Sequence, residues 1–165
     1  MTNQHNRIDA AVQRISSTGL ASTDVIQGCS DVEIRDIEES LQIHLPATYV
    51  RFLKLAGKGA GSFLIGTDWM YPRVKELRST AQWLLKESGS SYELSADAHV
   101  FTCHQDYNFL MFHCDGHDPA VWLYMEADSA PKKVFDRFTD WLSQCVSDEA
   151  SLLAEVKRRE LGPQE

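Results

Sequence analysis

The clearest pattern of apolar and polar positions follows Ser30. Ser30 and Glu33 have the spacing of a capping box, in which a hydroxyl and a carboxylate each bind a backbone amide at the start of a helix. Ile34, Ile37 and Leu41 then recur at helical spacing, so they fall on one face. The pattern predicts an amphipathic helix that begins directly after Ser30.

A second helix is predicted to start at Pro46, because proline fits the first turn of a helix, where its missing N–H costs little. Its apolar stripe consists of Tyr49, Phe52, Leu53 and Ala56. Gly57 is placed to end the helix in a left-handed conformation. The two helices, joined at Leu45-Pro46, present one apolar surface that the rest of the chain must cover.

A helical arm and a connector are predicted for residues 1–29. Asn6 is a candidate cap of a short helix whose apolar face consists of Ile8, Ala11, Val12 and Ile15. Segment 16–28 contains serine, threonine and two glycines, which is typical of a loop. The arm could dock on the rest of the chain or on a second copy, and the sequence leaves both alternatives open.

A strand with a break at Gly66 is predicted for residues 62–71, and a helix for residues 73–88. The apolar face of this helix consists of Val74, Leu77, Ala81, Leu84 and Leu85. Trp83 falls on the opposite face, about 180° away at roughly 100° per residue. A loop or the arm could cover this ring. The alternative is that Trp83 anchors a partner, since tryptophan is enriched at binding hot spots.

Three strands follow from Ala98 onward. The runs AHVFTCH, YNFLMFHC and AVWLYME are rich in aromatic and β-branched residues and are separated by turn signals at 105–106 and 115–119. Such short connections predict an antiparallel meander. The middle run is apolar at all its alternating positions, which predicts a central strand covered on both faces. The alternative is that one face stays partly open for a partner.

Two helices are predicted near the C-terminus. The first has a core stripe of Phe138, Trp141, Leu142 and Cys145. Ser147 or Asp148 can cap the last helix, at 148–161, which carries Leu152, Leu153 and Val156. The whole pattern predicts an α+β fold with a mainly antiparallel sheet flanked by N-terminal and C-terminal helices. The arm at 1–29 then precedes a single domain at 30–165.

Composition and charge narrow the possible partners. The chain has 165 residues and a formal net charge of −8, which argues against direct binding of nucleic acid, because phosphate contacts need clustered lysine and arginine. No apolar run approaches the roughly 20 residues of a membrane span, and no apolar core of a signal peptide is present. We therefore expect a cytoplasmic protein without membrane contact, whose four cysteines are reduced and mostly buried.

The negative charge is concentrated in two segments. Five carboxylates accompany one arginine in residues 31–44, and eight accompany three basic residues in residues 115–149. Ordinary solubility is one explanation. The alternative is a surface that steers a basic protein partner.

No residue set indicates catalysis or a cofactor. Cys103, His104, His113, Cys114 and His117 are zinc ligands by type, but neighbours on a strand point to opposite faces and would not converge. A cysteine–histidine nucleophile pair would lack an orienting third group. Glycine-rich phosphate loops and GxSxG motifs are absent. We therefore expect no enzyme activity, metal or cofactor.

The sequence LPATYVRFL at residues 45–53, between an acidic helix and a glycine-rich turn, resembles the opening signature of the SUKH superfamily. This group contains the yeast cell-wall-synthesis regulator and many bacterial toxin-immunity proteins. Ala56-Gly57 departs mildly from the Asn-Gly often found there. The later motifs HQDYNFLMF, DPAVWLYMEAD and VFDRFTDWL follow in the family's order. The resemblance covers about residues 30–146.

The resemblance implies a non-catalytic protein-binding module, first of all an immunity protein that neutralises a cognate bacterial polymorphic toxin. A nuclease toxin, whose own active site attracts phosphate, would be the basic partner that the acidic segments steer. The alternative is a regulatory or scaffold protein of the cell-wall-regulator kind, and a third is an enzyme of unrecognised type. A toxin gene immediately upstream would favour the immunity protein. A concentration-dependent dimer without such a gene would favour the scaffold, and turnover of a substrate would favour the enzyme. A monomer or a weak homodimer is expected.

The acidic meander is the predicted partner surface, because carboxylates at strand ends and turns are usually exposed. The carboxylates are Asp106, Asp115, Asp118, Glu126 and Asp128, and the candidate aromatic anchors among them are Tyr107, Trp122 and Tyr124. Some of these rings must belong to the core instead. The face around Trp83 is the second candidate.

Overall fold

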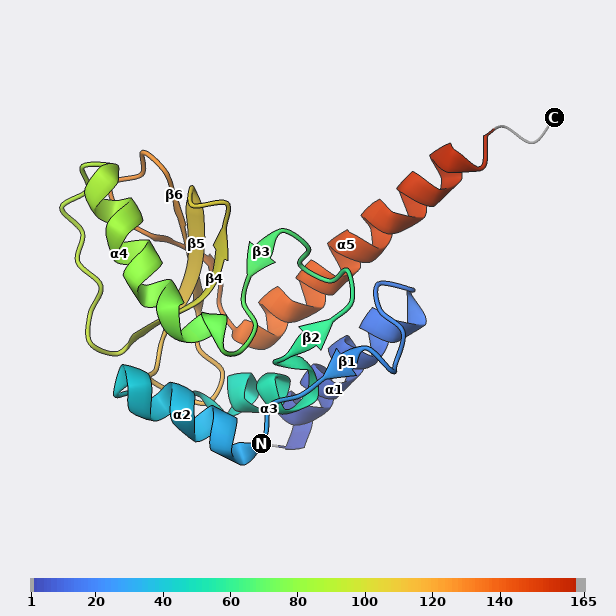
Figure 1. The fold of residues 1–165 in the computed structure, drawn as a ribbon, viewed down its shortest axis with the longest axis horizontal. Coiled ribbons are helices and arrows are strands. Elements are labelled where there is room, and N and C mark those ends of the chain that lie inside the picture. The colour runs from blue at the N-terminus through green and yellow to red at the C-terminus, as the bar shows by residue number, and fades with distance from the viewer. Residues whose placement is uncertain (1, 163–165) are drawn as a thin grey trace.

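The computed structural model describes residues 2–162, which form helices around a five-stranded antiparallel sheet of order β3-β4-β5-β6-β7 (Figure 1). The helices are α1 (Thr2–Ser17), α2 (Asp31–Leu41), α3 (Ala47–Ala56), α4 (Leu77–Glu87) and α5 (Phe138–Glu160), with a 3-10 turn η1 (Arg73–Glu76) before α4. The sheet contains β3 (Thr67–Asp68), β4 (Ala98–His104), β5 (Asn108–His113), β6 (Val121–Met125) and β7 (Lys132–Phe135). A separate ribbon pairs β1 (Ile26–Gln27) with β2 (Gly59–Ala60). The predicted α+β class is confirmed.

The helix pair α2–α3 forms as the sequence predicts. The Ser30 amide donates to the Glu33 carboxylate at 2.8 Å, and the Glu33 amide donates to the Ser30 hydroxyl at 3.2 Å, which completes the capping box. Helix α2 ends where Gln42 adopts a left-handed conformation, with a φ of 53°. Pro46 directly precedes α3, whose apolar stripe is buried. The pair thus supplies one wall of the core.

The predicted left-handed end at Gly57 is wrong. Gly57 has a φ of −61° and a ψ of −8°, which is right-handed backbone open to any residue. The reason for glycine is space, because a Cβ here would lie 2.7 Å from both the Cys29 Sγ and the Leu53 carbonyl oxygen. The glycine therefore allows the chain before α2 to pass closely against the end of α3.

The long strand predicted for residues 62–71 is also wrong. The segment is mostly turns, with Leu64 held at a φ of 55°, and only Thr67–Asp68 pairs with β4. Two of the apolar residues that suggested a strand, Phe63 and Trp69, instead reach the core individually from either side of the turn, whereas Ile65 is exposed. The spacing of apolar residues in a short run does not distinguish a continuous strand from turns that bury single side chains.

The meander β4-β5-β6 is confirmed. Gln105 and Asp106 turn the first hairpin with positive φ values of 47° and 57°. Strand β5 lies in the middle of the sheet, as its apolar pattern predicts. Phe109 and Met111 are buried on the face covered by α4, whereas Phe112 on the other face packs against Tyr49 of α3 at a ring separation of 5.2 Å.

The core is centred on aromatic rings from three parts of the chain. They are Tyr49 and Phe52 from α3, Phe101 and Phe112 from the sheet, and Phe138 and Trp141 from α5. Phe101 lies 4.8 Å from Trp141, and Phe138 meets Tyr49 edge-on at 5.5 Å. Edge-to-face contacts at such separations add to the free energy gained by burial.

Helix α1 docks on the rest of the chain. Its apolar face, Ile8, Ala11, Val12 and Ile15, is buried against α3 and α5. Asp9 accepts two hydrogen bonds from Arg51 of α3, at 2.7 and 2.9 Å, and Arg7 donates to Thr139 and Asp140 of α5. The helix already begins at Thr2, so the predicted cap at Asn6 is wrong.

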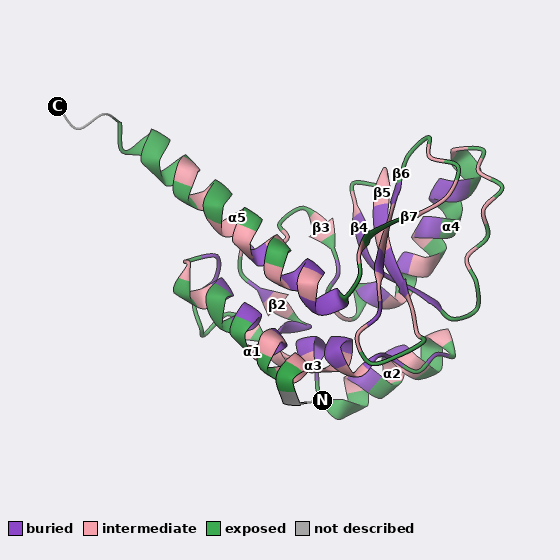
Figure 2. Ribbon diagram, turned by 180° about the vertical axis from the view of Figure 1, so that it is seen from behind, coloured by how far each residue is buried: buried purple, intermediate pink, exposed green. Residues whose placement is uncertain are grey.

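The two C-terminal helices predicted from the sequence are one continuous helix, α5. The Ser147 hydroxyl donates to the Ser143 carbonyl within the helix instead of capping a new one. Its first turns are buried in the core, its second half is largely exposed, and its last turns extend away from the other elements (Figure 2).

Phe52 provides a direct test of the core. Phe52 is 3% exposed and its ring lies 5.6 Å from Trp69 and 6.0 Å from Phe138. Replacement by alanine should lower the free energy of unfolding by roughly 3–5 kcal/mol, because the transfer energy is lost and a cavity remains. Urea denaturation measures this change. Val32→Ala, at a residue 65% exposed on α2, is the control and should change stability by less than about 0.5 kcal/mol.

His99 is a buried polar residue in the same cluster. The ring is 1% exposed and lies 5.1 Å from Tyr49 and 5.3 Å from Phe112, and neither ring nitrogen has a hydrogen-bond partner among the described residues. Burial, helped by the nearby positive charge of Arg78, lowers the pKa of His99 to about 3. The folded protein therefore holds this imidazole neutral.

Stability should consequently fall in mild acid. Below about pH 6.5 the unfolded chain protonates His99 and the folded chain does not, so each pH unit between about 6.5 and 3 should remove up to about 1.4 kcal/mol. His99→Leu should flatten this dependence, measured by urea unfolding at several pH values, whereas His44→Leu at an exposed site should not. If the free energy of unfolding depends on pH equally in the wild type and in His99→Leu, His99 is not the group that causes the loss of stability.

Candidate partner-binding surface

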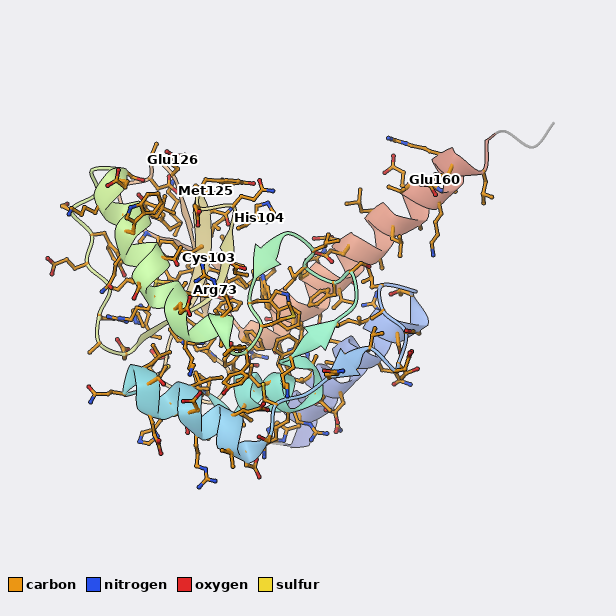
Figure 3. All side chains as sticks on the ribbon, in the orientation of Figure 1. Arg73, Cys103, His104, Met125, Glu126 and Glu160 are labelled. Carbon is orange, nitrogen blue, oxygen red and sulfur yellow. The ribbon has the colours of Figure 1, made fainter. Side chains whose placement is uncertain are left out.

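The two turns at one end of the meander bring several predicted site residues together. In an antiparallel meander, the β4–β5 and β6–β7 turns lie at the same end of the sheet. The Glu126 amide donates to the Tyr107 carbonyl at 2.8 Å and joins the two turns. Asp106 and Glu126 are exposed there, and Figure 3 shows Glu126 and Met125 at the sheet end remote from α2 and α3.

Asp115 and Asp118 lie at the opposite end of the meander. The six-residue strand β5, at about 3.4 Å per residue, separates the two ends by roughly 20 Å. Asp115 is exposed in the β5–β6 turn. The predicted acidic surface is therefore divided between two ends of the sheet.

Asp118 is occupied by bonds within the chain. Its carboxylate accepts hydrogen bonds from the Thr139 amide at 3.0 Å and from the Thr139 hydroxyl at 2.7 Å. Thr139 belongs to the first turn of α5, whose flanking Arg137 makes no side-chain cap. Asp118 thus acts as the missing cap from a distant turn, and its negative charge is favourable at this helix end.

The three predicted aromatic anchors differ in exposure. Tyr124 is fully buried and stacks on Phe109 at 5.0 Å, so it belongs to the core and is removed from the candidate surface. Trp122 and Tyr107 are half-buried. Tyr107 packs edge-on against His104 at 5.4 Å, beside Asp106. Of the three, Tyr107 is the one located at the acidic turns.

Trp83 is exposed, and neither the N-terminal arm nor a loop covers it. Its side chain on the outer face of α4 is 52% exposed. Together with Arg73, Ser79, Thr80 and Asp106, it lines an open depression of about 400 Å³. Two predicted site residues from separate elements, Trp83 and Asp106, are therefore neighbours. We call Trp83, Asp106, Tyr107 and Glu126 the acidic-turn surface.

The charges around this surface leave two carboxylates unpaired. Arg73 is ion-paired with Glu76 and, at 3.4 Å, with Asp68, and the bond to Glu76 raises the pKa of the Arg73 guanidinium. Lys132 donates to Asp128 at 2.6 Å and lowers the pKa of that carboxyl. Within residues 2–162, Asp106 and Glu126 take part in no salt bridge.

Sequence patterns did not indicate that Arg73, Ser79 and Thr80 belong to this site. Their positions were assigned to a helix, but the turn that they meet is distant in sequence. The sequence did contain a signal that Thr80 lies next to Trp83, because the two residues are three positions apart and share one helix face. The contribution of Asp106 to the same depression depends on how α4 packs on β4.

The histidines and cysteines of the sheet point in different directions. The Cys103 thiol donates to the Leu77 carbonyl under α4, at 3.9 Å, whereas the His104 ring bonds to the Thr67 hydroxyl at 2.8 Å on the other side. His113 lies 3.3 Å from Asp97. In the described part of the chain, no three histidine, cysteine or acidic side chains are placed to hold a metal ion. None of the helices in residues 2–162 is long and apolar enough to cross a bilayer.

The capping role of Asp118 can be tested by comparison with Asp115, an exposed carboxylate at the same end of the meander. Asp118→Ala should lower the free energy of unfolding by about 1–3 kcal/mol, because the Thr139 amide, in a residue 1% exposed, loses its partner. Asp115→Ala should change stability by less than about 0.5 kcal/mol. Chemical denaturation compares the two variants, and equal effects would contradict the capping role.

Comparison with known families gives one match. The model described as the SMI1 / KNR4 family (SUKH-1) matches residues 28–144. The matched span includes the acidic-turn surface and the first turns of α5, and it excludes α1 and the second half of α5. The comparison with curated proteins gives no match.

Proposed function

The chain belongs to the SMI1 / KNR4 family (SUKH-1), and we propose that it is a non-catalytic immunity protein that neutralises a bacterial polymorphic toxin by direct binding. Family membership is consistent with protein–protein interaction in general. The observation that carries the proposal is the half-exposed Trp83 ring beside the unpaired carboxylate of Asp106.

The acidic-turn surface has the two components that a protein interface needs. Trp83 offers a large apolar ring next to a depression that a partner side chain can enter, and such aromatic anchors supply much of the binding energy at interfaces. Asp106 and Glu126 add negative charge that attracts a basic partner over a distance. A nuclease toxin has the required basic surface, because it must bind phosphate.

The state of the thiols supports a non-catalytic role. Burial raises the pKa of Cys29 to about 11 and the pKa values of Cys103, Cys114 and Cys145 to about 12. At neutral pH these cysteines are therefore thiols, not the thiolates that nucleophilic catalysis requires.

A regulatory or scaffold role is the second candidate. The observation that favours it is the exposed second half of α5, which carries apolar side chains and lies outside the span that matches the family. A scaffold would act through such additional contacts. Absence of a toxin gene beside the gene of this chain would favour the scaffold over the immunity protein.

The proposed role of Asp106 and Glu126 in attracting a toxin can be tested by reversing their charges. Where the gene immediately upstream encodes a toxin, that protein is the probe, and association is followed by stopped-flow fluorescence at two or more salt concentrations. Asp106→Lys/Glu126→Lys should slow association about ten-fold at low salt and reduce its salt dependence. Asp115→Lys, at the other end of the meander, is the control. Unchanged association in a folded double variant would move the interface elsewhere.

The proposed role of Trp83 as a binding anchor can be tested by replacing it with alanine. Trp83→Ala should weaken binding of the same toxin by about 2 kcal/mol or more, which corresponds to a Kd about 30-fold higher. Most of this change should appear in the dissociation rate, because the ring makes short-range contacts. Val32→Ala, at an exposed apolar residue of α2, should leave the Kd unchanged. Isothermal titration calorimetry provides the comparison.

A further inference from the structure

The depression beside Trp83 combines an aromatic ring with hydrogen-bond acceptors. The ring belongs to the outer face of α4 and is exposed. The Asp106 carboxylate of the β4–β5 turn lines the same depression and takes part in no salt bridge within residues 2–162. Ser79 and Thr80 add hydroxyl oxygens, which can accept hydrogen bonds. This lining favours a ligand that donates hydrogen bonds and has a flat face to lay on an indole ring.

Arg73, the basic residue that lines the depression, is neutralised by neighbouring carboxylates. It pairs with Glu76 and, at 3.4 Å, with Asp68. With Asp106, three carboxylates accompany one guanidinium and leave a local net charge of −2. A carboxylate or phosphate entering the depression would therefore meet net repulsion, whereas a cation is attracted.

The Cys103 thiol, at the end of β4 that leads into this turn, indicates the same sign of charge. Burial is the main cause that raises its pKa to about 12. The negative charges of Asp68 and Asp106 raise this pKa further, and each has a larger effect than the lowering by Arg73. The carboxylates thus outweigh the guanidinium between α4 and the start of the turn.

Among cationic side chains, arginine fits this lining better than lysine. A guanidinium is planar, stacks on aromatic faces and can donate two parallel hydrogen bonds to one carboxylate, whereas an ammonium is a compact and strongly hydrated charge. Tryptophan is the aromatic residue that attracts a cation over its face most strongly. Ser79 and Thr80 precede Trp83 by four and three residues, so their hydroxyls share its helix face and lie beside the ring.

We propose that the depression binds an arginine side chain presented by a partner protein, with the guanidinium stacked on Trp83 and paired with Asp106. This inference rests on the proposed function and names the residue type by which a toxin is held at the acidic-turn surface. Recognition at this position then depends on the shape of the guanidinium as well as on its charge. A lysine in its place would be attracted over a distance but held less tightly.

Nuclear magnetic resonance titration of the isotope-labelled full chain tests the site without a toxin. The probe is N-acetyl-arginine amide, and Trp83→Phe identifies the indole signal of Trp83 among those of the four tryptophans. We expect this signal and the Asp106 amide signal to shift saturably, with a dissociation constant in the millimolar range, because one side chain makes few contacts. At equal ionic strength, N-acetyl-lysine amide and the neutral, similarly shaped N-acetyl-citrulline amide should bind at least about five-fold more weakly.

Removing single charges provides the matched control. Asp106→Asn should raise the dissociation constant of the arginine derivative about five-fold, because a charge-assisted pair is lost. Asparagine tolerates the left-handed backbone at this residue, where φ is 57°, so the turn is kept. Asp115→Asn, at the other end of the meander, should leave the constant unchanged. The proposal is wrong if the Trp83 signal shows no saturable shift, or if the lysine or citrulline derivative binds as tightly as the arginine derivative.

Binding of the upstream toxin separates this inference from the proposed function. A toxin arginine whose replacement by lysine weakens binding to the wild type, but not to Asp106→Asn, is the residue held in the depression. If Trp83→Ala weakens toxin binding and the arginine derivative does not bind, the proposed function stands and the arginine site is wrong. If the arginine derivative binds and Trp83→Ala leaves toxin affinity unchanged, the arginine site stands and the toxin docks elsewhere.

Discussion

Contacts among aromatic rings hold this fold together, because they join segments that are far apart in the sequence. Tyr49 in α3 meets Phe112 of the central strand at 5.2 Å and Phe138 of α5 at 5.5 Å. Neither the helix pair nor the meander can bury its own apolar surface alone. The cluster joins α3 and α5 to one face of the sheet, and α1 docks on these two helices.

Helix α5 links the core to the outside of the molecule. Its first turn is fixed by Phe138 in the aromatic cluster and by Asp118, which reaches it from the β5–β6 turn. Its last turns contact few other elements and expose Leu152 and Val156. Because the helix is continuous, the well-packed start determines the direction in which the free half points. Asp118, a predicted residue of the partner surface, therefore has a structural role, because it fixes the start of this helix.

Local patterns in the sequence predicted the elements whose cause is local. The capping box at Ser30, the stripe of α3 and the three strands of the meander all depend on neighbouring residues. Two of the failures have tertiary causes: Gly57 is required by contact with Cys29, and Phe63 and Trp69 reach the core from turns instead of from one strand. The candidate site was predicted in part, since Trp83 and Asp106 were both named, but their proximity depends on how α4 packs on the sheet.

The edges of the sheet determine which kinds of partner the protein can accept. On one side β3 has only two residues, and on the other β7 exposes Lys132 and Lys133. Short and lysine-bearing edges oppose the addition of a further strand, whether from a peptide or from another copy. Recognition by backbone pairing is therefore disfavoured, and selectivity depends on side chains presented by turns and helices. The same edges protect a sheet rich in aromatic and β-branched residues from growing into aggregates.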